Sequence, residues 1–432
     1  MIRTIAIALL ASAPSLALAA PGDHIRAGDV GIIPKIDVGA EARTNVYRDE
    51  SVAIPAANFR VAPGLLVASS GEDHEFRLDG QWVLRKYFFV GADPRPAPDV
   101  GRVINLDRYD EYNLGLGTNL FRKSVIGLRL SDDSALQNFR ADAEYANVPY
   151  SSQLRNHLAG ALRISPGEAL QILPGGSWKW DSFRVPASDD RPDRELNERN
   201  TYGPTLAVRW AFLPRTAFVA DASWARVDWT HNTLDAVPSQ AYGDNLALPD
   251  GSQTKATVGL EGRFTEKLFA QVDAGYGIAL YNADTVTAVD GGTLAADDDV
   301  QGVDGLLRTG QLRYSITPSD ERRRGSSIAA GYVRDFRSSF FTNYVRFDQV
   351  FADFQGRLGD VAPSLRYELR FEDYGGEVQR KDIVNRVSAD IKVAASDWAS
   401  ITGGGWWQQR ASEDPVVEYD DVNFHLMATF TY

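Results

Sequence analysis

The feature that most constrains this chain is an alternation of apolar and polar residues with a period of two. In residues 365–372 every odd position is apolar or aromatic and every even position is charged. The same alternation recurs in residues 76–79, 206–212, 260–263 and 387–393. A period of two places alternate side chains on opposite faces of a β-sheet. The pattern therefore predicts an all-β protein whose strands have one apolar and one polar face.

The connections between these segments are alternately short and long. Short ones lie at residues 71–73, 121–123, 165–168, 213–216, 265–267, 358–360 and 395–397. Longer polar stretches lie mostly between them, at residues 91–102, 131–148, 186–200, 231–251, 282–302 and 372–381. Tight turns at one end and longer loops at the other are typical of outer-membrane barrels. We therefore predict a transmembrane antiparallel β-barrel of about 18 strands.

A soluble β-sandwich or propeller is the alternative architecture. It requires apolar residues from two sheet faces to meet in one core, whereas here charges run along the polar face of whole strands. Two stretches are irregular. The phase of residues 340–356 slips near Asp348, which predicts a bulge or an inward aromatic cluster. The connection at residues 318–327 is longer than the other short connections.

The two ends of the chain carry export and assembly signals. Residues 1–19 combine Arg3, an apolar stretch and the sequence Ala17-Leu18-Ala19, which predicts a secretory signal peptide. Residues 20–432 are then the exported barrel. The final segment is an amphipathic strand that ends in an aromatic residue and resembles the signal read by the bacterial barrel-assembly machinery. Its proposed signal residues share one face: Phe424, Leu426, Phe430 and Tyr432.

Composition excludes several other classes of protein. The chain of 432 residues has no cysteine, which excludes disulfides, thiolate nucleophiles and cysteine-ligated metals. Its 58 acidic and 45 basic side chains give a charge of −13, which disfavours nucleic acid as a partner. The hydrophobic fraction is 44% and the mean hydropathy −0.27, values that argue against membrane helices. Strands with one lipid-facing and one lumen-facing side produce such an average.

Three stretches resemble a family of Gram-negative outer-membrane β-barrel porins linked to polysaccharide export. They are residues 35–47, residues 59–65 and the closing hairpin of residues 407–423. Thr44-Asn45 stands where that family commonly has an Asp-Asn pair. The resemblance implies an 18-stranded barrel that passes polar solutes or exported polysaccharide, with polysaccharide-export components as partners. It supplies no catalytic residues.

The polar face supplies the candidate functional residues. If the apolar faces meet outer-membrane lipid and lipopolysaccharide, both signs of charge line the lumen. Such a lining suits neutral or weakly charged solutes, including sugars, although the same residues could simply pair across strands. The predicted pore-lining residues are Asp37, Glu41, Arg43, Arg60, Arg77, Asp79, Arg85, Arg155, Arg209, Glu261, Arg263, Gln271, Asp273, Arg313, Arg366, Glu368, Arg370, Glu372, Arg386, Asp390 and Lys392.

Aromatic residues near strand ends predict an interfacial girdle, with Trp407 or Trp178 as a candidate sugar-stacking platform in the lumen. The acidic run at residues 297–299 does not match a calcium loop, because Arg308 falls where the bidentate glutamate belongs. We therefore predict no metal and no cofactor.

The sequence contains little that indicates catalysis. Its five histidines are scattered, and neither H-E-x-x-H nor G-x-S-x-G occurs. We predict a passive channel and no enzyme. Two alternatives stay open: a barrel hydrolase acting on lipid or peptide, for which His157 is the residue to name, and a plugged structural or adhesive barrel.

Overall fold

The computed structural model describes residues 24–45, 53, 55–89, 109–137, 152–185, 194–231, 250–281, 302–316, 325–339, 343–375 and 379–432. The predicted signal peptide lies outside these residues. Within these residues nearly all regular structure is strand, with one short 3₁₀ helix at Pro415–Val417. Within the described residues no helix is long and apolar enough to cross a membrane.

The first strands are β1 (Ile25–Ala27), β2 (Val30–Arg43), β3 (Ala56–Ser70), β4 (His74–Phe89), β5 (Tyr109–Leu120), β6 (Ile126–Gln137), β7 (Ser152–Ile164), β8 (Leu170–Val185), β9 (Arg194–Leu213) and β10 (Thr216–His231). The remaining strands are β11 (Gly251–Arg263), β12 (Leu268–Tyr281), β13 (Val303–Ser315), β14 (Ser327–Ser338), β15 (Tyr344–Gln355), β16 (Val361–Gly375), β17 (Arg380–Ala394), β18 (Ala399–Ser412) and β19 (Tyr419–Thr431).

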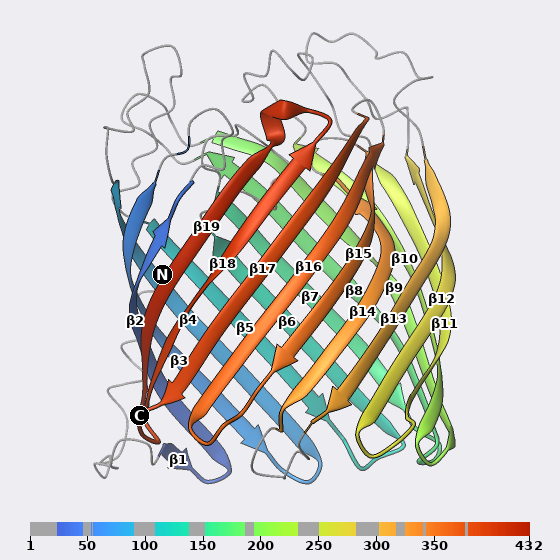
Figure 1. The fold of residues 1–432 in the computed structure, drawn as a ribbon. Helices are drawn as coiled ribbons and strands as arrows, with labels where there is room; N and C mark the ends of the chain where they lie inside the picture. The colour runs from blue at the N-terminus through green and yellow to red at the C-terminus, as the bar shows by residue number, and fades with distance from the viewer. Residues whose placement is uncertain are drawn as a thin grey trace.

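Strands β2 to β19 form a closed ring in which sequence neighbours pair antiparallel (Figure 1). The ring closes where β19 pairs with β2, with Leu426 opposite Ala40 and Phe430 opposite Ile36. Short strand β1 folds back on the start of β2. Closure leaves no unpaired sheet edge, which a spanning sheet requires. The predicted fold, an antiparallel barrel of 18 strands, is confirmed.

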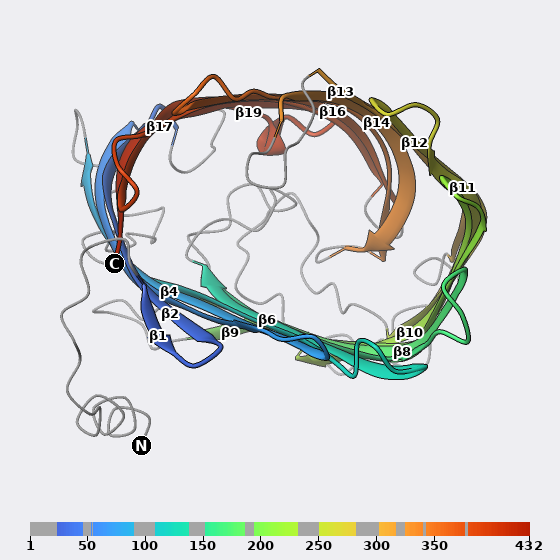
Figure 2. The same cartoon turned by 90° about the horizontal axis from the view of Figure 1, so that it is seen from below.

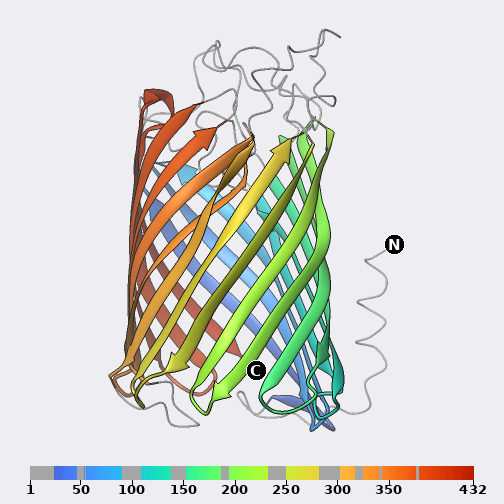
Figure 3. The same cartoon turned by 90° about the vertical axis from the view of Figure 1, so that its right-hand side faces the viewer.

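The predicted short connections are confirmed as turns or bends at one end of the barrel, where β1 and the C-terminus also lie (Figures 1 and 3). We call this the periplasmic end. In the turn between β15 and β16, Gly359 has a φ of 63°, a left-handed conformation that glycine adopts without steric cost.

The boundaries predicted for the long connections are wrong in three places. β6 continues to Gln137, β9 begins at Arg194, and β16 and β17 together reduce residues 372–381 to a short gap. The reason is that charged residues on the inner face of a barrel are ordinary strand residues, so polar composition does not end a strand. The other long connections lie largely outside the described residues.

One face of the sheet carries exposed apolar side chains around the ring. On β19 this face presents Phe424 and Leu426, which are 63% and 61% exposed. The predicted assembly residues Phe424, Leu426, Phe430 and Tyr432 therefore lie on one face, as expected, while their role in assembly stays a prediction. The backbone N–H of Tyr432 donates to the carbonyl of Pro34 at 3.0 Å, so strand pairing runs to the last residue.

Aromatic side chains on this apolar face donate hydrogen bonds to polar groups of the following strand. These bonds form a band that we call the external girdle. Its donor–acceptor pairs are Trp178 with Asn200, Tyr202 with Asp228, Tyr276 with Asp304, Tyr332 with Asp348, Tyr367 with Asn385, and Trp407 with Asp420. Such rings mark the boundary between hydrocarbon and head groups. A closed barrel with an apolar exterior and this girdle is an outer-membrane protein.

The lipid-facing side of β19 allows a stability test. We expect Leu426→Arg, near the middle of the strand, to destabilise the barrel by about 2–4 kcal/mol, because it places a charge in hydrocarbon. Thr429→Arg, on the opposite face beside Asp37, is the matched control and should cost far less. Equilibrium unfolding in lipid vesicles measures both. Equal destabilisation by the two substitutions would contradict the assignment of faces.

Candidate functional site

The polar face of the sheet lies inside the barrel. Arg199 Nη1 on β9 donates to the backbone carbonyl of Ser338 on β14 at 3.4 Å. Four strands separate β9 from β14 along the ring, so this contact passes through the interior. Asp181 on β8 is ion-paired with Arg199 at 2.9 Å and lies on the same face. Strand register carries this inner face around the whole barrel.

Register places all of the predicted pore-lining residues on the inner face. Many of them are paired there: Asp37 with Gln81, Arg43 with Asp421, Arg77 with Asp79, Arg209 with Glu261, Gln271 with Asp273, Arg366 with Glu368, Arg370 with Glu372, and Asp390 with His425. Glu41 is paired with both Arg60 and Arg85. The remaining ones lie on the same face of β7, β11, β13 and β17: Arg155, Arg263, Arg313, Arg386 and Lys392.

Two charge networks brace the external half of the inner wall. In the first, Arg85 lies between Glu41, at 2.7 Å, and Glu111, at 3.2 Å, and so links β2, β4 and β5. In the second, Arg410 on β18 pairs with Asp382 and with Glu372, the latter at 3.0 Å. Charges held this closely by several partners support the wall, because their desolvation is offset by hydrogen bonds.

Sequence reasoning missed several members of these networks. Arg380, which pairs with Asp382 at 2.9 Å, lies in a segment that reads as a loop. Arg410 belongs to the closing hairpin, which was considered only for its family resemblance. A signal was present: Asp382, Val384 and Arg386 continue the inward positions of β17 toward the external end. Extending the period-two register past the last clear alternation would have found them.

The external ends of β14 and β15 leave the wall and fold into the ring, as Figure 2 shows for the end of β14. Pairing between β13 and β14 stops at Arg308 and Arg334, whereas β14 and β15 stay paired as far as Ser338 and Tyr344. We call this segment, residues 335–338 with residues 344–347, the inward hairpin. It narrows the interior beside β9, β11 and β12.

Polar side chains on the inner face of β11 hold the inward hairpin. Lys255 Nζ on β11 contacts Asp335 at 2.7 Å and the Phe336 carbonyl at 2.6 Å. Gln253 Nε2 donates to Ser338 Oγ at 2.5 Å. These contacts supply partners for groups that left the β13 ladder, so the hairpin is a built part of the lumen.

The inward hairpin also has an apolar anchor. Phe336 is buried against Ala279, Val303 and Leu307. Its ring lies over Gly277, where an added Cβ would collide with it, so glycine is required for this close approach. Tyr344 stacks on Tyr281 with ring centroids 6.5 Å apart.

This cluster decides between the two predictions made for residues 340–356. An inward aromatic cluster is confirmed through Tyr344, which belongs to this stretch and packs inside the ring against Tyr281 and Phe336. The predicted bulge near Asp348 is wrong, because β14 and β15 pair without a shift in register. The slip in phase arises because β15 carries aromatic residues on both faces, with Phe347 and Phe351 inward and Phe354 outward.

Exposure of inner-face charges changes along the barrel axis. Near the periplasmic turns, the side chains of Arg77, Arg209 and Arg366 are 64%, 50% and 47% exposed. Toward the external end, those of Arg199 and Arg410 are 6% and 1% exposed. Water therefore reaches the inner wall in the periplasmic half, and the wall is covered in the external half.

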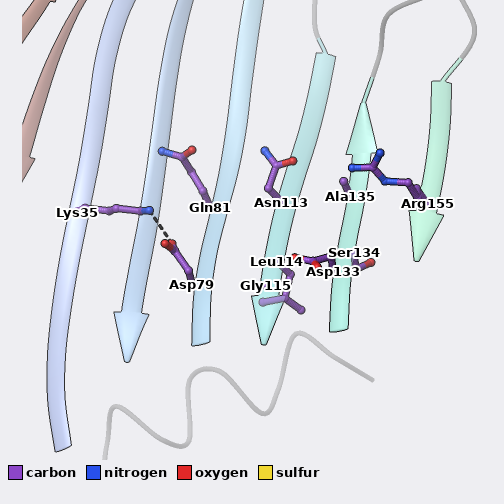
Figure 4. A pocket seen from close by; sticks show the side chains of 10 residues that line it. All are labelled: Lys35, Asp79, Gln81, Asn113, Leu114, Gly115, Asp133, Ser134, Ala135 and Arg155. Carbon is purple, nitrogen blue, oxygen red and sulfur yellow. Dashed lines mark hydrogen bonds and ion pairs between the residues drawn. The ribbon is translucent and has the colours of Figure 1, made fainter. Parts of the chain in front are cut away.

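The inner wall of β2 and β4 to β7 contains a recess of about 310 Å³ (Figure 4). Lys35 and Asp79 form an ion pair of 2.6 Å at one side. Asn113, Asp133 and Arg155 lie on successive strands, and none makes a hydrogen bond or ion pair with another described residue. An amide, a carboxylate and a guanidinium thus face the same water-filled space, which is a hydrogen-bonding surface for a polar ligand.

The prediction that Trp407 or Trp178 forms a sugar-stacking platform in the lumen is wrong. Trp407 and Trp178 lie outside, in the external girdle, where their indole N–H groups bond Asp420 and Asn200. Of the adjacent pair on β18, Trp406 lies on the inner face, with the guanidinium carbons of Arg43 and Arg386 lying 5.3 and 5.4 Å from its ring centroid. A shift of one residue exchanges the faces of a strand, and a Trp-Trp pair does not reveal which member is inside.

His157, the residue named for the hydrolase alternative, lies on the inner face opposite Asp133 and Lys179. No serine lies directly opposite it in either pairing. Among the described residues no three histidine, aspartate or glutamate side chains gather into a metal-binding group. The acidic run at residues 297–299 lies outside the described residues.

Neither family models nor curated proteins match this chain. Solved structures similar to it include OccAB3 of Acinetobacter baumannii, at 11% identity, 94% coverage of this chain, 99% of that chain and a TM-score of 0.42. A BenF-like porin from Pseudomonas fluorescens has 10% identity, covers 93% and 99%, and has a TM-score of 0.47. OpdK of Pseudomonas aeruginosa, solved with vanillate, has 12% identity, covers 93% and 98%, and has a TM-score of 0.44.

Because these sequence identities and TM-scores are low, the fold class of this chain rests on its own strand register and not on the similarity to solved structures. The resemblance to polysaccharide-export porins stays a prediction.

The absence of cysteine makes the position of the inward hairpin testable. We expect Gln253→Cys with Ser338→Cys to be linked efficiently by a short bifunctional thiol reagent, because the native side chains are in contact. Gln253→Cys with Ser364→Cys, on distant β16, is the control and should stay unlinked. Mass spectrometry of the treated barrel measures both. Equal linking in the two variants would show that the hairpin does not occupy this position.

Proposed function

We propose that this protein is a porin-like channel that lets small polar solutes diffuse across the outer membrane. The observation that carries the proposal is the exposure of inner-face charges in the periplasmic half, which indicates a water-filled vestibule. Solutes would pass between this vestibule and the exterior beside the inward hairpin. Because both signs of charge line the wall, neutral and zwitterionic polar solutes encounter no barrier of one sign.

Exported polysaccharide is a narrower hypothesis about the cargo. It rests on the sequence resemblance, as do the polysaccharide-export components predicted as partners. The inward hairpin favours small solutes over a bulky polymer, because it occupies part of the external half of the ring. We therefore place small polar solutes first. Catalysis stays outside the proposal, since no serine lies directly opposite His157 in its strand pairings.

Planar-bilayer recording tests the channel directly. We expect the purified protein to give unitary current steps, and Phe336→Ala to enlarge them, because losing this buried ring weakens the hairpin anchor by about 3 kcal/mol. Val350→Ala, on the outer face of neighbouring β15, is the control and should leave the current unchanged. A silent wild-type protein would instead support the plugged structural barrel.

The recess on β5 to β7 predicts a solute interaction. We expect a neutral oligosaccharide to raise the open-channel current noise, because Asn113 and Asp133 offer hydrogen bonds to vicinal hydroxyl groups. Asn113→Ala with Asp133→Ala should reduce this effect about tenfold, the equivalent of losing one or two hydrogen bonds. Ser388→Ala, on the inner face of β17, serves as the control. Undiminished noise in the double variant would remove the recess from the pathway.

A further inference from the structure

Two arginines lie directly opposite each other on the outer face of the barrel. Arg308 on β13 pairs in register with Arg334 on β14. Both belong to the lipid-facing side, since Leu306 and Leu312 on β13 share that face and are 52% and 55% exposed. Like charges directly opposite each other on a sheet repel, and arginine on the lipid face of a barrel is unfavourable away from the interface. This pair therefore calls for a physical explanation.

The pair lies at the level of the external girdle. Arg308 stands on β13 between Leu306, which is opposite girdle residue Tyr276, and Gly310, which is opposite girdle residue Tyr332. Tyrosine rings of a girdle sit at head-group level. The two guanidinium groups therefore reach the layer where the external leaflet carries its charged groups, which a long arginine side chain does readily.

Nearby carboxylates offset only part of the charge of the pair. Asp304 accepts the hydroxyl of Tyr276 at 2.6 Å, and Asp348 accepts that of Tyr332. Asp348 also lies directly opposite Arg334 and forms an ion pair with it at 3.8 Å, so one carboxylate faces two guanidinium groups. Arg308 makes no hydrogen bond or ion pair with any described residue. By contrast, Arg226 on the same outer face has its own carboxylate, Asp228, at 2.6 Å.

We propose that Arg308 and Arg334 together bind a phosphate group of an anionic glycolipid in the external leaflet, such as the lipopolysaccharide expected around this barrel. Two guanidinium groups that repel each other are both stabilised by a phosphate between them, and guanidinium matches phosphate through paired N–H donors. Leu306 and Leu312 flank the pair, so its ligand must present phosphate and hydrocarbon at once. That combination selects a lipid over a soluble anion.

Binding of a defined lipid tests the proposal. The full-length barrel in uncharged sugar detergent is titrated with a bis-phosphorylated lipid A and with its dephosphorylated form, and bound lipid is counted by native mass spectrometry. We expect wild type to prefer the phosphorylated lipid by about tenfold or more. Arg308→Gln with Arg334→Gln should lose this preference, and the corresponding double lysine variant should keep part of it because the charge remains.

Arg226→Gln is the matched control, since it removes an outward arginine that already has a carboxylate, and it should bind like wild type. The glutamine variant removes a repulsion, so it should fold, which heat-modifiable gel mobility confirms. Equal binding of both lipids by wild type would overturn the proposal, as would undiminished binding by the glutamine variant. A change in oligomeric mass without a change in lipid binding would assign the pair to a contact between barrels, and would also overturn it.

Discussion

The structure depends on one constraint: within hydrocarbon every backbone N–H and C=O needs a partner inside the protein. A sheet satisfies it by closing, and here the closure is the pairing of β19 with β2, which continues to the bond between Tyr432 N–H and the Pro34 carbonyl. Closure divides side chains into an outward and an inward set. The alternation along each strand, the outer girdle and the charged interior all follow from that division.

The inward hairpin is the exception that the same constraint explains. Where β14 leaves β13, its backbone loses ladder partners, and side chains of the wall replace them. Lys255 donates to the Phe336 carbonyl and Arg199 to the Ser338 carbonyl. Phe336 meanwhile covers the adjoining inner surface at Val303 and Leu307. A strand pair can enter the lumen because the lumen wall is polar enough to pair with its backbone and apolar enough, at one place, to anchor it.

The sequence predicted the barrel, its turns and the face of each pore-lining candidate, because period two encodes the division into faces directly. It failed where long-range contacts decide. Arg199 and Arg380 lie within polar stretches that composition alone cannot tell from loops. The partners of Lys255 are about 80 residues away in the chain, as its bond to Asp335 shows. Trp407 was predicted to face the lumen in place of Trp406, because two adjacent tryptophans fit either register. The local sequence pattern thus predicts the barrel wall, whereas contacts between distant residues determine the inward hairpin that narrows the lumen.

The inward hairpin and the external girdle contact opposite faces of β12 at the same level of the barrel. On β12, Gly277 receives the ring of Phe336 inside, while its neighbour Tyr276 bonds Asp304 outside. The wall is therefore supported from both sides where it meets the outer head groups. Lipid contacts at this level and the position of the hairpin act on the same residues of β12 and β13. A phosphate held by Arg308 would stabilise β13 beside Leu307, on which the hairpin anchor packs. The membrane surface and the proposed solute path thus share one structural support.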